Sequence, residues 1–258
     1  MRNSLRPTNY PTGWERYWNS VSERPVDVFW SADPAEALQD KTLFADTFDA
    51  DLPLVDVGCG DGRHTLALAR LTRFREVIGV DVALSAIRHA QAAATEGCVS
   101  FRVLDLLDPE QAEALHDEIG DTNVHVRGVL HQFPAVYRKT AVESLVRLLG
   151  GSGTLYLKEL TPSSEAYLAD MLNRVGQPSS LSRVIHELSP VNISWGGLSN
   201  SDLEELFPSD RFMLIRKGES RVQTTNHLPS GERIELPAVY ALLRIVNELQ
   251  ASTGFRKR

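Results

Sequence analysis

A short strand, a glycine-rich turn and a helix lie close together near residue 60 and constrain the fold most strongly. Residues 54–57 (Leu-Val-Asp-Val) are apolar and partly β-branched, which is typical of a buried parallel strand. The strand stops at Gly58, Gly60 and Gly62, which allow left-handed or crowded backbone close to a ligand. The Leu- and Ala-rich segment 65–71 then predicts a helix whose first N–H groups face the turn. The segment therefore predicts the opening of an α/β fold.

The spacing of the glycines indicates which ligand this turn accepts. Dinucleotide sites use G-x-G-x-x-G and P-loops use G-x-x-x-x-G-K-[ST], whereas this turn is G-x-G-x-G without the lysine. Asp56 precedes the turn and Asp61 lies within it. Both add negative charge where a pyrophosphate would sit, so the turn favours a ligand that carries positive charge.

Acidic residues follow the next two predicted strands. The strand over 76–81 ends in Asp81, nineteen positions after Gly62. An acid at about that distance lies at the tip of the neighbouring strand, where it accepts hydrogen bonds from ribose hydroxyls. A cap for a helix over 85–94 is the alternative role. The third strand begins at Val99 and leads to Asp105.

Asp56-x-Gly-x-Gly-x-Gly, Asp81 and Asp105, in this order, resemble the motifs of class I S-adenosylmethionine-dependent methyltransferases over roughly residues 52–159. The resemblance implies S-adenosyl-L-methionine as cofactor, with Asp105 accepting from the adenine amino group and Leu106 lining the ring. The cofactor-binding residues expected from it are Asp56, Gly58, Gly60, Asp81, Val82, Asp105, Leu106 and Arg127.

The resemblance also implies the architecture of the whole chain. We expect a Rossmann-like, seven-stranded, mostly parallel sheet with helices on both faces and an antiparallel C-terminal hairpin. Residues 211–225 and 234–246 are the predicted strands of that hairpin, joined by a turn-prone stretch. A methyltransferase domain over 51–258 would carry a cap insertion at about 161–201, in which His186 is a candidate substrate contact.

The first 50 residues are predicted to form an N-terminal helical lid. They are rich in aromatic residues and proline, with helices expected over 14–20 and 34–48. Tyr17, Trp18 and Trp30 are candidate substrate contacts, since aromatic rings combine apolar area with a polar group. Packing of these rings on the outer face of the sheet is the alternative.

The fourth and fifth predicted strands, over 123–133 and 153–160, supply the candidates for chemistry. Arg127 stands near the place of a common family acid; it pairs either with a carboxylate of cofactor or substrate, or with Asp56 or Asp61 in a buried network. His131 is the candidate general base, because histidine titrates in the useful range, or else a buried histidine at a helix start. Glu159 is the second candidate general base and a candidate substrate contact, with a stabilising ion pair as its other role.

Composition limits the partners. The chain has 258 residues, 42% of them hydrophobic and 24% charged, with a net charge of −7, which argues against nucleic acid as a partner. The absence of an apolar leader or long apolar span predicts a cytoplasmic protein without membrane contact. We expect a small-molecule acceptor and allow for a homodimer.

The two cysteines and seven histidines complete this set of expectations. Cys59 and Cys98 are predicted at opposite edges of the sheet, and therefore as free thiols. The spacing of carboxylates, histidines and cysteines indicates no metal site.

We therefore expect transfer of a methyl group from S-adenosylmethionine to oxygen, nitrogen or carbon of a small molecule. The alternatives are a nicotinamide-dependent oxidoreductase, which predicts the third glycine one position later and no need for Asp105, and an inactive methyltransferase-like scaffold.

Overall fold

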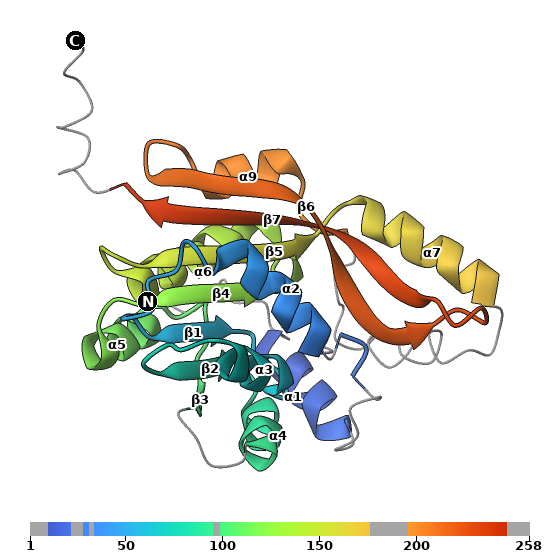
Figure 1. Ribbon diagram of the computed structural model, residues 1–258, viewed down its shortest axis with the longest axis horizontal. Coiled ribbons are helices and arrows are strands. Elements are labelled where there is room, and N and C mark those ends of the chain that lie inside the picture. The colour runs from blue at the N-terminus through green and yellow to red at the C-terminus, as the bar shows by residue number, and fades with distance from the viewer. Residues whose placement is uncertain (1–9, 22–27, 31–33, 95–98, 176–195, 247–258) are drawn as a thin grey trace, which may run out of the picture.

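The computed structural model describes residues 10–21, 28–30, 34–94, 99–175 and 196–246. A seven-stranded sheet in the order β3-β2-β1-β4-β5-β7-β6 forms its centre (Figure 1). Its first five strands pair in parallel, and β7 runs antiparallel to both β5 and β6. The predicted fold class is thereby confirmed. The strands are β1 (Leu54–Val57), β2 (Val77–Asp81), β3 (Val99–Val103), β4 (Asn123–Arg127), β5 (Thr154–Leu160), β6 (Phe212–His227) and β7 (Arg233–Ile245).

Helices cover both faces of the sheet, and successive strand residues alternate between the two. Val55 and Val57 face the core with α5 (Pro109–Ile119), α6 (Ala135–Leu149) and α9 (Asn200–Leu206), whereas Leu54 lies on the opposite face with α2 (Pro34–Phe44) and α3 (Arg63–Leu71). Each such buried side chain contributes about 1.5 to 3 kcal/mol. The helices are α1 (Tyr10–Ser20), α2 (Pro34–Phe44), α3 (Arg63–Leu71), α4 (Leu84–Ala93), α5 (Pro109–Ile119), α6 (Ala135–Leu149), α7 (Ser163–Val175) and α9 (Asn200–Leu206), with a 3₁₀ turn η2 (Leu130–Gln132).

The N-terminal helices lie on the face that carries α3 and α4. Glu15 of α1 accepts hydrogen bonds from the backbone N–H and the hydroxyl of Ser85, at 3.0 and 3.2 Å, and the imidazole of His89 contacts the carbonyl of Trp18. Helix α2 ends at Phe44, earlier than expected. A turn follows it and stacks the ring of Phe48 on that of Phe44, with centroids 4.4 Å apart.

The β6–β7 hairpin continues well beyond the pairing with β5, and α7 packs against β7 near the far end (Figure 1). Its strands agree closely with the predicted 211–225 and 234–246. Within the part of the chain described, no helix has the length and apolar character needed to span a bilayer. His186 and Cys98 lie outside the described residues.

Candidate functional site

The glycine turn between β1 and α3 approaches its surroundings closely. Gly58, Gly60 and Gly62 all have positive φ, at 70, 54 and 74°. A Cβ atom at Gly60 would lie 2.7 Å from the indole of Trp18, so this position has no room for a side chain. Bare backbone therefore borders the space above the strand ends, as the sequence predicts.

Asp81 joins this turn to the start of α4. One carboxylate oxygen accepts from the N–H of Gly60 at 3.0 Å, and the other accepts from that of Ala83 at 2.9 Å. Burial raises the pKa of Asp81 to about 6, against the lowering effect of these hydrogen bonds. The side chain thus supports the loop before α4 and also faces the pocket described next.

A pocket opens over the carboxyl ends of the parallel strands, where α/β sheets bind ligands. Asp105 is not among the described residues that line it, because its carboxylate turns back to accept from the N–H of Leu107 at 2.8 Å. Leu104 borders the pocket instead. Of the predicted cofactor residues, those that line it are Asp56, Gly58, Gly60, Asp81, Val82, Leu106 and Arg127.

Apolar side chains from the N-terminal segment, β5 and the β6–β7 hairpin also line the pocket. The predicted substrate contacts Trp18 and Trp30 lie in it, whereas Tyr17 packs behind them, with its ring 5.3 Å from that of Trp18. Sequence reasoning did not assign a site role to Trp14, Phe29, Leu160, Val222 or Leu236, which also line the pocket. The last two come from the β6–β7 hairpin and have no local signature.

His131 lines the pocket from η2, with Glu159 behind it. Glu159 is fully buried; its carboxylate contacts Nδ1 of His131 and accepts from the N–H groups of Val129 and Leu130 at 3.0 and 2.8 Å. The Gln132 amide lies 2.6 Å from Nε2 of His131. A proton on Nδ1 donated to Glu159 leaves Nε2 as the acceptor of this imidazole.

Arg127 lines the pocket and pairs with an acid that sequence reasoning did not single out. Its guanidinium donates to Glu36 of α2 and to the carbonyl of Trp30, both at 3.0 Å. Although burial alone would lower the pKa of Arg127, the carboxylate of Glu36, assisted by Asp40 and Asp56, raises it. The partner lies 91 positions earlier in the chain, which is why spacing does not reveal it.

Behind Arg127 the charge network continues beneath α2. Lys158 donates to Glu36 and to Asp40, at 2.9 Å each, and all three side chains are fully buried. The hydroxyl of Tyr156 also donates to Asp40, at 2.8 Å. These contacts hold α2 against β5.

Asp56 and Cys59 flank the start of the glycine turn, and both are buried. Asp56 accepts from Thr65 at 2.5 Å and contacts Nδ1 of His125 at 2.8 Å. Cys59 is a buried free thiol; its pKa is raised well above the ordinary value by burial and by the carboxylates of Asp81, Asp56 and Asp61. The thiol therefore stays protonated and unreactive at neutral pH.

This strand order, with the reversed β7 and the glycine turn at the ligand-binding edge, defines a class I methyltransferase fold. The methyltransferase domain family model matches residues 54–153. An S-adenosylmethionine-dependent methyltransferase from Anabaena variabilis is 33% identical with a TM-score of 0.84, and the match covers 94% of this chain and 98% of that one. The chain therefore belongs to the S-adenosylmethionine-dependent methyltransferases, and S-adenosylmethionine is its cofactor.

More distant structures share the fold. One, solved in work on the conversion of a disulfide bond into a thioacetal group during echinomycin biosynthesis, has 20% identity and a TM-score of 0.63, covering 95% of this chain and all of the other. The N-methyltransferase NodS from Bradyrhizobium japonicum, in complex with S-adenosylhomocysteine, has 14% identity and a TM-score of 0.55, covering 93% of this chain and all of that one. Comparison with curated proteins gives no match.

Proposed function

We propose that the methyl acceptor is a small apolar or aromatic molecule, methylated at oxygen, nitrogen or carbon, and that His131 removes its proton. The observation that carries this proposal is the placement of the His131–Glu159 pair in the same pocket as the wall containing Trp18 and Trp30. S-adenosylmethionine, when bound, supplies a methyl group that is already activated by the sulfonium charge.

The lining of the pocket fits the cofactor. The bare backbone at Gly58 and Gly60 leaves room for close approach, and Asp81 has acceptor capacity beyond its two backbone hydrogen bonds for ribose hydroxyls. Leu104 and Leu106 offer apolar contact for a base. The proposed cofactor set is Asp56, Gly58, Gly60, Asp81, Val82, Asp105, Leu106 and Arg127, in which Asp105 acts through the turn that presents the two leucines.

Glu159 prepares His131 for proton removal. By accepting from Nδ1, the carboxylate fixes the ring and its tautomer, so that Nε2 carries the lone pair. Gln132 already occupies that lone pair, so its amide moves aside or is replaced when the acceptor group arrives. The anion of Glu159 then stabilises the imidazolium. Its role is to position and stabilise, because it is fully buried behind the histidine.

The aromatic wall supports the assignment of the acceptor class. Trp14 meets Trp30 edge to face with centroids 5.8 Å apart, and Trp30 also packs against Tyr17 at 5.5 Å. Together with Leu160, Val222 and Leu236 these rings favour an acceptor with an apolar body. In this proposal the N-terminal segment acts as a lid whose rings exclude water from the reacting groups.

The test uses the full chain with isotope-labelled S-adenosylmethionine and a panel of phenols, carboxylic acids, amines and thiols, read by mass spectrometry. Transfer to apolar or aromatic members, lost in His131→Ala while cofactor binding persists, would support the proposal. Transfer restricted to small polar compounds, or to nucleic acid or protein, would contradict it. Trp30→Ala should raise KM for the accepted compound more than it lowers kcat, because the ring binds and does not react.

A further inference from the structure

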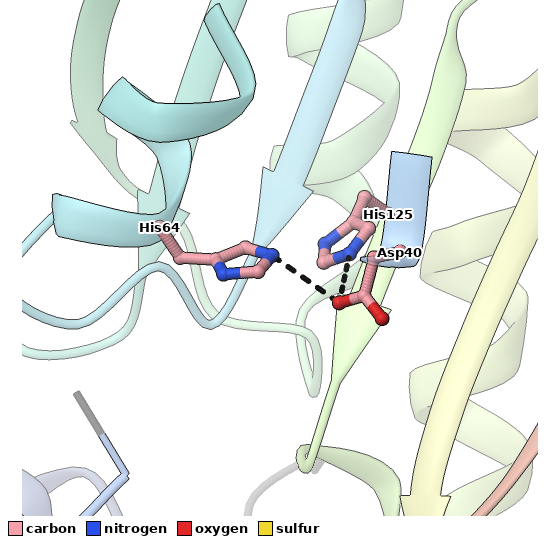
Figure 2. A group of neighbouring side chains, drawn as sticks. All are labelled: Asp40, His64 and His125. Atoms are coloured by element: carbon pink, nitrogen blue, oxygen red, sulfur yellow. Dashed lines mark ion pairs between the residues drawn. The ribbon is translucent and has the colours of Figure 1, made fainter. Parts of the chain in front are cut away.

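Three buried side chains from separate elements converge behind the pocket. Asp40 comes from α2, His64 from the first turn of α3 and His125 from β4, and the two imidazoles flank one carboxylate oxygen (Figure 2). The Oδ2 atom of Asp40 lies 3.5 Å from Nε2 of His64 and 3.7 Å from Nε2 of His125. The ligand atoms of the cluster all lie within 4.8 Å of one another.

These distances are long for hydrogen bonds but suit ligands that share an ion. Bonds of about 2.0 to 2.1 Å to a tetrahedral ion place two ligand atoms about 3.3 Å apart. Oδ2 of Asp40 and Nε2 of both histidines are buried and make no hydrogen bond in the structure. Their contacts with one another are long ion pairs that need a protonated imidazole, and buried polar atoms require a partner when they are removed from water.

Neighbouring groups engage the other polar atom of His125 and of Asp40. The Nδ1 atom of His125 is engaged by Asp56 at 2.8 Å, which leaves Nε2 with its lone pair for another partner. In the same way, the Oδ1 atom of Asp40 accepts from Tyr156 and Lys158 and leaves Oδ2 available. A carboxylate behind a ligating histidine is the usual support in metal sites.

Charge balance favours a cation at this point. The buried carboxylates of Glu36, Asp40 and Asp56 are opposed by Lys158 and Arg127, so the side chains that surround the two imidazoles carry one negative charge in excess. A metal ion would neutralise this negative charge, as would a proton on one imidazole. A metal ion would also engage all three ligand atoms at once.

We propose that Asp40, His64 and His125 bind a divalent transition-metal ion, with Zn²⁺ favoured by the donor set of two imidazoles and one carboxylate. A water molecule would complete four-coordination. His64 also borders the pocket, which gives the ion a path of entry. Bound there, the ion would fasten α2 to α3 and β4. The sequence gives no sign of the site because its ligands are distant from one another along the chain.

The test titrates chelator-treated full-length protein with Co²⁺, whose tetrahedral complexes absorb visible light. The expected result is one ion per chain, displaced by Zn²⁺, and a rise in melting temperature on addition of metal. His64→Gln should weaken Co²⁺ binding by roughly a hundredfold or more, because it removes a ligand. His116→Gln, in which a partly exposed histidine facing Asp121 is replaced, should bind as the wild type does.

Two results would overturn the proposal. One is metal binding that His64→Gln and Asp40→Asn leave unchanged, which would place the ion elsewhere. The other is a wild-type protein that takes up no ion at saturating Zn²⁺, or one in which NMR shows His125 still protonated on both nitrogens when Zn²⁺ is saturating. The NMR measurement on wild-type protein decides the question even where a variant fails to fold.

Discussion

Glu159 lies fully buried directly behind His131, and its carboxylate contacts Nδ1 of the imidazole while accepting backbone N–H groups of the same turn. One carboxylate therefore sets both the conformation of η2 and the orientation of the histidine at the pocket. This relationship makes the two residues a unit.

We expect His131→Ala to slow turnover by roughly a hundredfold or more and to leave cofactor affinity unchanged, because the variant lacks the proton acceptor. Adding Glu159→Gln to it should cost little more, since residues that act as a unit have non-additive effects. Single-turnover rates and calorimetry measure both quantities. If His131→Ala kept the wild-type rate, His131 would not be the base, and the chain would accelerate the reaction only by aligning the acceptor with the methyl group.

The proposed contact of Asp81 with the ribose would make cofactor binding sensitive to pH. Its pKa of about 6 means that ribose hydroxyls, which favour the ionised carboxylate, must displace a proton at pH 6 and below. Affinity should be level above pH 6 and should fall as the pH drops below it, by up to about tenfold per unit. Calorimetry in buffers of different ionisation enthalpy detects the released proton. Asp81→Asn should bind more weakly by about 1.5 to 3 kcal/mol and release none.

The same shift affects the stability of the cofactor-free protein, with the opposite sign from an ion-paired acid. Because folding raises the pKa of Asp81 from the ordinary 3.8, this group favours the folded state fully below pH 4. That contribution is lost as the pH rises from about 4 to about 6. Asp81→Asn should remove it, so the difference in unfolding free energy between variant and wild type should change across this range and be level outside it.

Gly60→Ala tests the close approach at the turn. The new methyl group would meet the Trp18 indole and displace it from the pocket wall, and cofactor binding should be lost. Gly231→Ala is the matched control, since Gly231 also has positive φ, at 87°, but nothing within 4 Å of the added atom. The control should be destabilised only by the backbone strain of the added Cβ atom, about 1 to 2 kcal/mol. Equal melting temperatures and affinities for the two variants would refute close approach at Gly60.

The buried ion pairs of Lys158 with Glu36 and Asp40, beneath α2, should contribute more to the free energy of unfolding than exposed ion pairs do. Lys158→Met removes the buried ammonium that Glu36 and Asp40 share, and we expect a loss of about 3 to 5 kcal/mol in the free energy of unfolding, measured in urea. Lys139→Met removes an ion pair with Glu205 in which both side chains are more than 60% exposed. It should cost less than about 1 kcal/mol. A Lys158→Met variant as stable as Lys139→Met would show that the network does not hold α2.

The features that the sequence could predict are those with local causes. Strand periodicity, glycine spacing and an acid at the end of β2 are read within a few residues, and each lies where expected. Contacts between distant elements leave no such trace. The pairing of Arg127 with Glu36 required α2 to be placed over the sheet first. The position of Asp105 after β3 predicts a contact with the adenine. The direction of its carboxylate, however, is set by the hydrogen bond from the N–H of Leu107.

The β6–β7 hairpin extends beyond β5 and supplies a part of the pocket wall that can be altered separately from the glycine turn. Val222 and Leu236 face each other across the two strands and line the pocket. Exchanging bulk within this single cross-strand pair would reshape that wall without disturbing Gly60 or Asp81. A lineage of such enzymes can therefore diversify in what it methylates while conserving how it recognises the methyl donor.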